Sequence, residues 1–336
     1  MPRPLPTDLR QLLRRVSRSF YLTIRILPRK IEPQIGVAYL LARATDTIAD
    51  TRLVPIGRRL EALHQMRETT LDGAHPAPTF NDLVAGCGTA GERELLLSAE
   101  KILRLLRAFS PEDRRLIANL LTTITAGQEL DLERFGSASG EHIAALQTDA
   151  ELEDYTYRVA GCVGEFWTRL CRTHLFPATR LDDQRLLENG VRFGKGLQLV
   201  NILRDVPGDL RQGRCYLPLE ALAKHALTPE ALLSAASMDS FRPLYRMYLQ
   251  RAEEHLAAGW DYTNSLPRSQ VRVRLACAWP ILIGMKTLAL LHKRNVLDER
   301  NRVKISRSEI RRLILRSLLC YPFPSRWKRL AGSQDF

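Results

Sequence analysis

Helical periodicity runs along almost the whole chain of 336 residues and constrains its fold more than any other feature. Apolar residues recur three or four positions apart, as on the buried face of an amphipathic helix. Runs of alternating β-branched residues between turn signals are missing, and no stretch suits a parallel sheet. The sequence therefore predicts an all-α fold, with helices over 9–27, 31–50, 57–70, 92–108, 111–135, 141–174, 181–206, 238–264, 267–295 and 306–319.

The segments between these helices do not look like interdomain linkers. Loops are expected at 72–91, 135–140 and 207–218, and each is too short or too mixed in composition to separate two domains. We therefore expect a single domain over 1–336. Its last part, about 311–336, is a basic amphipathic tail.

The chain is strongly basic. Fifty Lys and Arg against 37 Asp and Glu give a formal net charge of +13, which attracts nucleic acid, anionic membranes or phosphorylated substrates. Sign alone does not choose among them. Segment 311–330 mixes Arg and Lys with Leu, Ile, Trp and Phe, so two interpretations stay open: contact with an anionic bilayer, or a surface helix with a solvated basic face.

Cysteine usage indicates a reducing compartment, and hydropathy argues against a membrane span. The six cysteines form no CxxC pair, which is typical of free thiols in a reducing compartment. The most apolar stretch, 275–291, contains Pro280 and Lys286 and is short for a membrane span. We expect a buried core helix there.

The first acidic motif is the segment 39–50. On a helix, Asp46 and Asp50 lie one turn apart on one face, which Arg43 and Tyr39 share. Paired carboxylates suit Mg²⁺, a hard ion that takes oxygen ligands and shares its coordination shell with phosphates. The alternative is an ordinary exposed acidic pair, but the apolar run 37–42 argues against a solvated face.

The second acidic motif is the segment 198–209. Asn201, Asp205 and Asp209 stand four residues apart, and Arg204 is adjacent. Pro207 intervenes, so we expect Asp209 to lie where the helix loosens. If the two motifs face each other across a helical bundle, their four carboxylates require cations. Several Mg²⁺ ions that hold a diphosphate are the natural occupants.

Four ordered motifs give the chain a resemblance to a known family. They are segment 17–20 (SRSF), the first acidic motif, segment 155–165 (YTYRVAGCVGE), and the second acidic motif with its tail 213–218 (GRCYLP). With these motifs the chain resembles the squalene and phytoene synthase family, the head-to-head isoprenoid coupling enzymes, over most of its length. The resemblance implies an all-α bundle around a central apolar cavity that both acidic motifs cap.

The resemblance also implies roles for individual residues. Tyr155 would assist proton transfer near a carbocation, although a Tyr on an apolar helix face is usually core. Gly161 and Gly164 would allow close helix packing or leave room for substrate. The metal ligands would be Asp46, Asp50, Asn201, Asp205 and Asp209. Diphosphate would be held by Arg18, Ser19, Arg43, Arg204 and Arg214, and the prenyl cavity would be lined by Phe20, Tyr39 and Gln198.

The C-terminal third is most like that of squalene synthases. This implies Mg²⁺-dependent (or Mn²⁺-dependent) condensation of two farnesyl diphosphates through presqualene diphosphate, then reduction to squalene by NADPH. Lys304 matches one member of a basic pair that helps hold NADPH; Ser306 replaces the other, and Arg307 lies next to it. Ala49 also departs from the acidic residue that squalene synthases often have. The alternative products are presqualene diphosphate, dehydrosqualene or phytoene.

Other nucleotide motifs are missing. No GxGxxG follows a strand, and the segment 194–196 lacks the Ser/Thr of a P-loop, so we expect Lys195 on a helix surface. The expected partner is farnesyl diphosphate rather than nucleic acid. A non-catalytic basic protein is a further alternative, against which the two acidic motifs argue. We expect a cytoplasmic protein, with peripheral contact to the inner membrane face through its tail.

Overall fold

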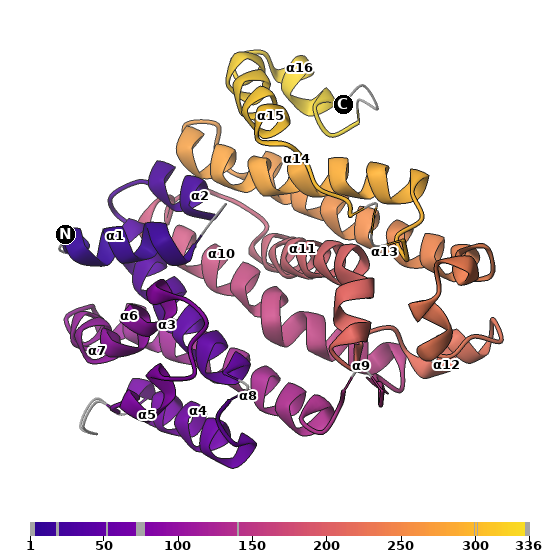
Figure 1. The fold of residues 1–336 in the computed structure, drawn as a ribbon. Helices are drawn as coiled ribbons and strands as arrows, with labels where there is room; N and C mark the ends of the chain where they lie inside the picture. Colours follow the sequence, from indigo (N-terminus) through magenta and orange to yellow (C-terminus); the bar gives the residue numbers. More distant parts are fainter. Residues whose placement is uncertain are drawn as a thin grey trace. The chain divides into compact units, whose positions relative to one another are not determined.

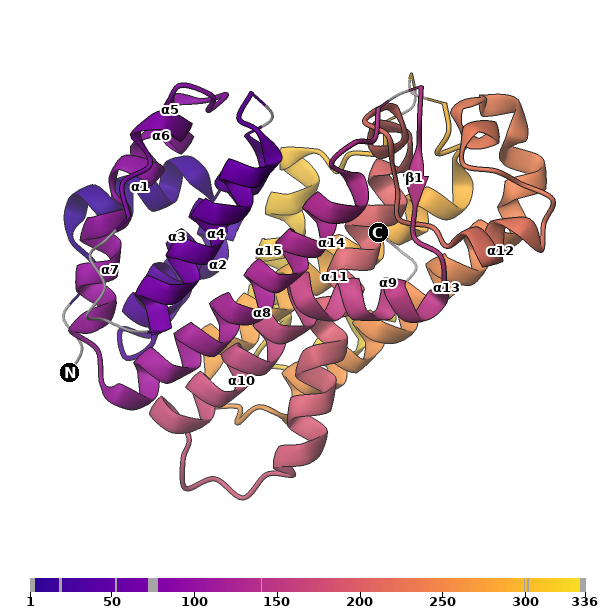
Figure 2. The ribbon, with the colours of Figure 1, turned by 90° about the horizontal axis from the view of Figure 1, so that it is seen from below.

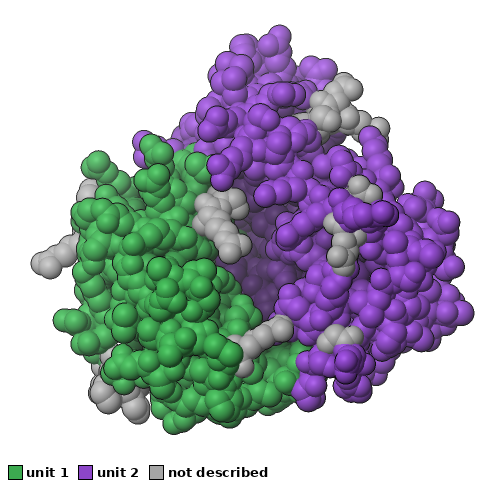
Figure 3. Space-filling model, in the orientation of Figure 1, with its two compact units in different colours: residues 1–136, 166–179 green, residues 137–165, 180–336 purple. Residues whose placement is uncertain are grey.

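The computed structural model describes residues 4–17, 20–51, 53–71, 78–139, 141–298, 300 and 302–332. Within these residues the chain is mainly helical, with only two strands of two residues each, which confirms the all-α prediction (Figure 1). It forms two compact units, coloured in Figure 3. Unit 1 comprises 1–136 and 166–179, and unit 2 comprises 137–165 and 180–336. The single domain stays a prediction, because two compact units can belong to one folding domain.

Unit 1 is built around one deeply buried helix, α3, which packs against α4, α6, α7 and α8 (Figure 2). Its helix α8 starts where Ser110 and Pro111 predict, since the Ser110 hydroxyl accepts the backbone N–H of Asp113 at 3.1 Å. The helices of the unit are α1 (Thr7–Val16), α2 (Phe20–Ile26), α3 (Glu32–Asp50), α4 (Ile56–Leu71), α5 (Asn81–Val84), α6 (Ala90–Leu97), α7 (Ala99–Arg107), α8 (Pro111–Phe135) and the C-terminal part of α10 (Cys162–His174).

Unit 2 is centred on the long helix α11, which packs against α13, α14 and the π-helical segment η1. Its α-helices are α9 (Asp149–Thr156), the start of α10, α11 (Asp183–Arg211), α12 (Leu219–Ala223), α13 (Met238–Ser265), α14 (Val271–Lys293), α15 (Arg307–Cys320) and α16 (Pro324–Arg329). Its other elements are η1 (Tyr157–Gly161), the 3₁₀ turns η2 (Glu230–Leu233) and η3 (Ala235–Ser237), and the strands β1 (Ala144–Ala145) and β2 (Arg214–Cys215).

The helix α11 does not end at Pro207 as predicted; it continues to Arg211. A proline has no N–H to donate to the carbonyl four residues earlier, here that of Leu203. The hydroxyl of Tyr245 on α13 donates to this carbonyl oxygen at 2.9 Å. The prediction of a loosened helix at Asp209 was therefore wrong, because a tertiary hydrogen bond replaces the missing one.

The segment predicted as one helix over 141–174 is interrupted. It contains β1, which pairs in parallel with β2 over two residues, and the π-helical turn η1 before α10. Glycines bring η1 and α10 against the backbone of α11: a Cβ on Gly164 would lie 1.8 Å from the carbonyl oxygen of Gly190. The packing interpretation of Gly164 is confirmed.

The described part of the C-terminal tail packs on the rest of unit 2. The Trp279 indole on α14 donates to the Ser317 hydroxyl on α15 at 3.0 Å, and the side chain of Trp327 is only 3% exposed. Among the described residues one helix, α14, is long and apolar enough to cross a membrane, and 56% of its most apolar window is buried inside the structure. Such burial is typical of a core helix.

Candidate active site

The first acidic motif lies on the one open stripe of α3. The other sides of this helix are buried, whereas Asp46 and Asp50 are exposed and Tyr39 and Arg43 are half-buried. All four lie on one face, because they follow one another at intervals of three or four residues. A polar stripe on an otherwise buried helix is a place where a ligand can reach charged groups.

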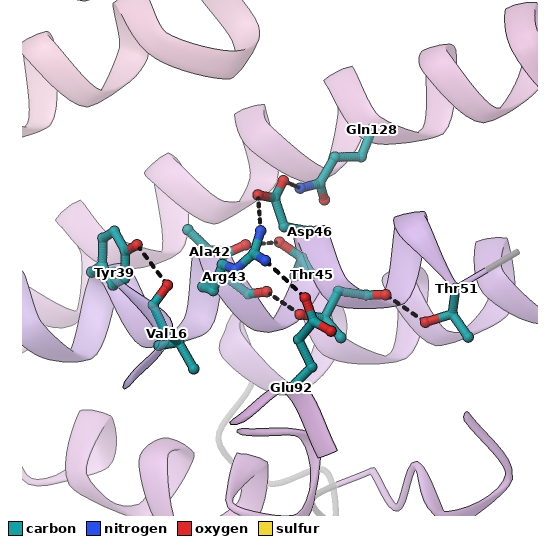
Figure 4. Close-up of polar contacts among 10 residues, drawn as sticks. Val16, Tyr39, Ala42, Arg43, Thr45, Asp46, Thr51, Glu92 and Gln128 are labelled. Carbon is teal, nitrogen blue, oxygen red and sulfur yellow. Dashed lines mark hydrogen bonds and ion pairs between the residues drawn. The ribbon is translucent and has the colours of Figure 1, made fainter. Parts of the chain in front are cut away.

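The Asp46 carboxylate is held from two sides (Figure 4). Arg43 donates to its Oδ2 at 3.2 Å, and Gln128 on α8 donates to its Oδ1 at 2.9 Å. Arg43 also donates to Glu92 at 3.0 Å, so one guanidinium serves two carboxylates. Glu92 and Gln128 were not singled out from the sequence.

The local charges favour a cation at Asp46. Desolvation by the surrounding protein and the neighbouring Asp50 raise the pKa of Asp46, and Arg43 and Gln128 offset this only in part. The Asp46 side chain is nevertheless 52% exposed, so a cation from solution can reach it. A bound cation would remove the penalty of two adjacent carboxylates.

Two buried polar atoms beside Asp46 have no hydrogen-bond partner among the described residues: Oε1 of Gln128 and Nε of Arg43. The first is an acceptor that fits a hard cation, and the second is a donor that fits a phosphate oxygen. Gln128 is buried on the apolar face of α8 that Ile124 and Leu132 also form. A lone Gln on such a face was the available sequence signal.

Aromatic side chains flank the first motif. Phe20 stacks on Tyr39 with ring centroids 5.2 Å apart, and the Tyr39 hydroxyl donates to the Val16 carbonyl at 3.4 Å. The structure thus brings two of the three predicted cavity residues together. Arg18 and Ser19 lie outside the described residues.

The second acidic motif lies on unbroken helix. Because α11 continues through Pro207, Asn201, Asp205 and Asp209 follow one another at one-turn intervals, and Gln198 lies on the same side. Arg204 donates through Nε to Oδ1 of Asp205 at 3.0 Å and through Nη2 to Oδ2. The pKa of Arg204 is raised, first by its hydrogen bonds to Asp205 and further by the charges of Asp205 and Asp209.

A second basic residue reaches this motif from another element. Nη2 of Arg302, in the segment between α14 and α15, lies 3.8 Å from Oδ1 of Asp205. The sequence holds no local signal for Arg302, since the contact joins residues far apart in the chain. The predicted nucleotide-binding residues Lys304 and Arg307 are both exposed.

Tyr155 is packed against the tail of the second motif. Its ring stacks on Tyr216 at 4.7 Å, and its side chain is 7% exposed. Arg214 is half-buried in β2, one residue after Gly213, whose φ of +80° only glycine adopts readily. The structure therefore joins two of the sequence motifs within unit 2.

Lys195 is not on the helix surface as predicted. Its side chain is 17% exposed and donates to Glu153 on α9 at 2.5 Å. His255 and Lys195 lower the pKa of Glu153 to about 2. Lys195 therefore holds α9 to α11, and the prediction was wrong because flanking glycines let other helices cover it.

The donor atoms of the two motifs suit Mg²⁺. Within the described parts of the chain no three His, Cys, Asp or Glu side chains gather as a metal site. Each motif instead offers two aspartates and one amide, Gln128 in the first and Asn201 in the second. Mg²⁺ is commonly held by one or two carboxylates together with waters and substrate phosphates. The residues present fit that ion.

The chain belongs to the squalene/phytoene synthase family, whose model matches residues 13–309. Members of this family are prenyltransferases of isoprenoid biosynthesis. The bifunctional lycopene cyclase/phytoene synthase of Phaeosphaeria nodorum is 29% identical over 68% of this chain and 37% of that protein. The squalene synthase of Schizosaccharomyces pombe is 25% identical over 92% of this chain and 64% of that protein.

The fold agrees with the family. A solved complex of TcSQS with a ligand has a TM-score of 0.77 and 23% identity, and the match covers 98% of this chain and 93% of that one. The chain spans less than two thirds of the length of the two relatives above.

Proposed function

We propose that this protein is an Mg²⁺-dependent prenyltransferase of the squalene synthase type. It would condense two farnesyl diphosphates head to head through presqualene diphosphate and reduce this intermediate to squalene with NADPH. The observation that carries the proposal is the pair of acidic motifs. Each presents aspartates one turn apart on an open helix face with a guanidinium bonded to the first of them.

The first motif would hold metal and diphosphate through Asp46, Asp50 and the free amide oxygen of Gln128. Mg²⁺ bound there would stabilise the negative charge of the departing diphosphate. Arg43 would donate its unpartnered Nε–H to a phosphate oxygen. Arg18 and Ser19 are assigned to the same diphosphate by the family resemblance alone.

The second motif would act on the other diphosphate. Asn201, Asp205 and Asp209 are the proposed ligands, and Arg204 and Arg214 the proposed phosphate donors. Because Arg204 now occupies both oxygens of Asp205, it would have to turn toward the phosphate when a cation binds. The proposal requires both motifs to act on one pair of bound substrates.

The remaining residues would protect and deprotonate the carbocation. Closing a cyclopropane ring releases one proton from the prenyl chain, and we assign its transfer to Tyr155. Its stacking on Tyr216 fixes the ring in a largely buried position. Phe20, Tyr39 and Gln198 would line the prenyl chain and exclude water, which would otherwise quench the cation.

The family resemblance assigns NADPH in the reductive step to Lys304, with Arg307 beside the replaced second basic position. Both side chains are exposed cations in unit 2, the unit that also holds the second motif, and exposed cations fit a phosphorylated nucleotide. NADPH would supply hydride to the rearranged cation. Ser306 at the second basic position favours the alternative: a synthase of presqualene diphosphate, dehydrosqualene or phytoene that needs no reductant.

The test is incubation with farnesyl diphosphate and Mg²⁺, with and without NADPH, followed by chromatography of the products. Squalene that forms only with NADPH supports the proposal. Presqualene diphosphate or dehydrosqualene that forms with or without NADPH, or phytoene from geranylgeranyl diphosphate, supports the alternative. If neither farnesyl nor geranylgeranyl diphosphate turns over, the protein is not a prenyltransferase of this type.

We further propose that the tail touches an anionic bilayer, as suits an enzyme that releases an oily product. Its buried side packs on α14, but Leu315, Leu318, Leu319 and Phe323 are 46–65% exposed among arginines. Such a face binds anionic lipid through apolar burial and charge together. Flotation with anionic vesicles should weaken for Leu318→Ser with Leu319→Ser. It should not change for Leu97→Ser, an equally exposed leucine on α6. Equal flotation of both variants and wild type would refute this contact.

A further inference from the structure

We propose that Arg302 and Lys304 form one phosphate-binding strip beside the second acidic motif, and that Arg302 rather than Arg307 is the partner of Lys304. The inference rests on the proposed function only for the identity of its ligands. The binding chemistry itself is that of any phosphate group. The strip is defined as residues 302–306.

The strip alternates like an extended segment. Val303 and Ile305 are buried, at 4% and 9% exposure, whereas Arg302, Lys304 and Ser306 are exposed. In an extended chain, residues two apart point to the same side and stand about 7 Å from each other. Arg302 and Lys304 therefore present two cations to one side, at a spacing that a diphosphate or a nucleotide can bridge.

Ser306 has a structural role at the start of α15. Ser306 caps α15: its hydroxyl accepts the backbone N–H of Glu309 at 3.2 Å, and the Glu309 carboxylate accepts the Ser306 N–H at 2.9 Å. Glu309 is also paired at 2.8 Å with Lys286, whose side chain is buried on α14. This anchor fixes the C-terminal end of the strip.

Arg307 leaves the alternation of the strip because it is the first residue of α15. The alternation of an extended segment does not continue into a helix, so it gives no reason to place Arg307 on the same side as Lys304. The nearest basic residue that continues the exposed face of Lys304 is Arg302, two positions before it. The strip thus presents two cations, Arg302 and Lys304, on one face, and Ser306 serves as the N-cap of α15.

Arg302 can exchange its contact with Asp205 for one with a phosphate. Its guanidinium is 79% exposed and lies 3.8 Å from Asp205, whose two oxygens already accept from Arg204. An exposed ion pair at that distance contributes little free energy and is easily broken. A phosphate that arrives at the second motif would accept two hydrogen bonds from the planar guanidinium, the geometry that arginine favours.

The ligand is a phosphate group, which two sources can supply: the diphosphate of a prenyl substrate, or a phosphate of NADPH. The experiment measures binding by calorimetry with three probes: inorganic diphosphate with Mg²⁺, NADPH, and NADH, which lacks the 2′-phosphate. The variants are Arg302→Ala, Arg302→Lys and Arg307→Ala. Arg300→Ala is the matched control, because Arg300 is exposed and paired with Asp298.

We expect Arg302→Ala to weaken at least one probe about tenfold or more, the range for a lost charged hydrogen bond, while Arg300→Ala binds like wild type. Arg302→Lys should recover part of the loss. A loss confined to NADPH assigns the strip to the 2′-phosphate. An equal loss for NADPH and NADH assigns it to the nucleotide diphosphate, and a loss for inorganic diphosphate assigns it to the prenyl substrate.

Three results would overturn the inference: unchanged binding by Arg302→Ala, a larger loss in Arg307→Ala, or no binding of any probe by the wild-type protein. Because no turnover is measured, these outcomes are independent of the proposed reaction. A wild-type protein that binds phosphate through Arg302 but does not convert farnesyl diphosphate would refute the function and keep the strip.

Discussion

The two acidic motifs are alike in sequence but differ in how their leading aspartate is neutralised. Asp46 is held by the neutral amide of Gln128 and by an arginine that it shares with Glu92. Asp205 is held by Arg204 through both oxygens and is approached by Arg302. Among the residues that the structure describes, one guanidinium serves two carboxylates at the first motif, whereas two guanidinium groups approach one carboxylate at the second.

This difference suggests a division of labour. A carboxylate with raised pKa and an unpartnered amide oxygen nearby is suited to take a cation directly. The Asp205 carboxylate is already paired with two guanidinium groups. It would bind a metal cation once a phosphate accepts the hydrogen bonds of these guanidinium groups instead. The second motif should therefore bind metal and phosphate together, whereas the first should bind metal more readily alone.

The largest effect should come from removing either leading carboxylate. Asp46→Asn and Asp205→Asn should each lower kcat/KM by about 10²–10³-fold or more, because preorganised charge at the leaving group is lost. Steady-state assays with farnesyl diphosphate measure this, with Asp239→Asn, an exposed aspartate on α13, as control. A residual activity above a tenth of wild type in either variant would break the assignment of that motif.

Replacing Gln128 tests whether the first motif binds Mg²⁺ through this amide. Gln128→Leu should raise the Mg²⁺ concentration for half-maximal activity about 10–100-fold, as for other residues that orient metal ligands. At saturating Mg²⁺ most of kcat should return. Gln250→Leu, an exposed glutamine on α13, should change neither quantity. An unchanged Mg²⁺ dependence would mean that Gln128 serves packing only.

The helix beneath the second motif depends on Tyr245. Tyr245→Phe leaves the buried Leu203 carbonyl without its donor and should lower the free energy of unfolding by about 1–3 kcal/mol. Urea denaturation measures it. In a Pro207→Ala background the restored N–H can bond Leu203, so the same change should cost less. Equal costs in both backgrounds would contradict the link between Pro207 and Tyr245.

The smallest effect concerns Glu309, which anchors the C-terminal end of the phosphate-binding strip. Hydrogen bonds from Lys286 and Ser306 lower the pKa of Glu309 to about 2. A depressed carboxyl pKa stabilises the fold above its unfolded value, near 4.5, and the contribution disappears as pH falls toward 2. Thermal unfolding between pH 5 and 2.5 should therefore depend less on pH in Glu309→Gln than in wild type. Glu100→Gln, in an exposed pair of unit 1, should keep the wild-type dependence.

Local sequence signals predicted the helices well and failed where distant residues intervene. The range 111–135 has the bounds of α8, because Ser110, Pro111 and the apolar period are all local. Pro207 was misjudged since its compensation comes from Tyr245 on another helix. Likewise, carboxylate spacing identified Asp46 and Asp205, but not Gln128 or Arg302, which only tertiary packing brings to them.

The pairing of Lys286 with Glu309 has a consequence for synthesis of the chain. The ribosome makes α14 first, and this helix is apolar enough to be taken for a membrane span. A lysine in such a helix opposes insertion into a bilayer by about 2.5–3.5 kcal/mol. Once Glu309 follows, the same charge joins α15 to the buried face of α14. By this argument Lys286 would oppose membrane insertion of the nascent helix, and in the folded chain it joins α14 to α15.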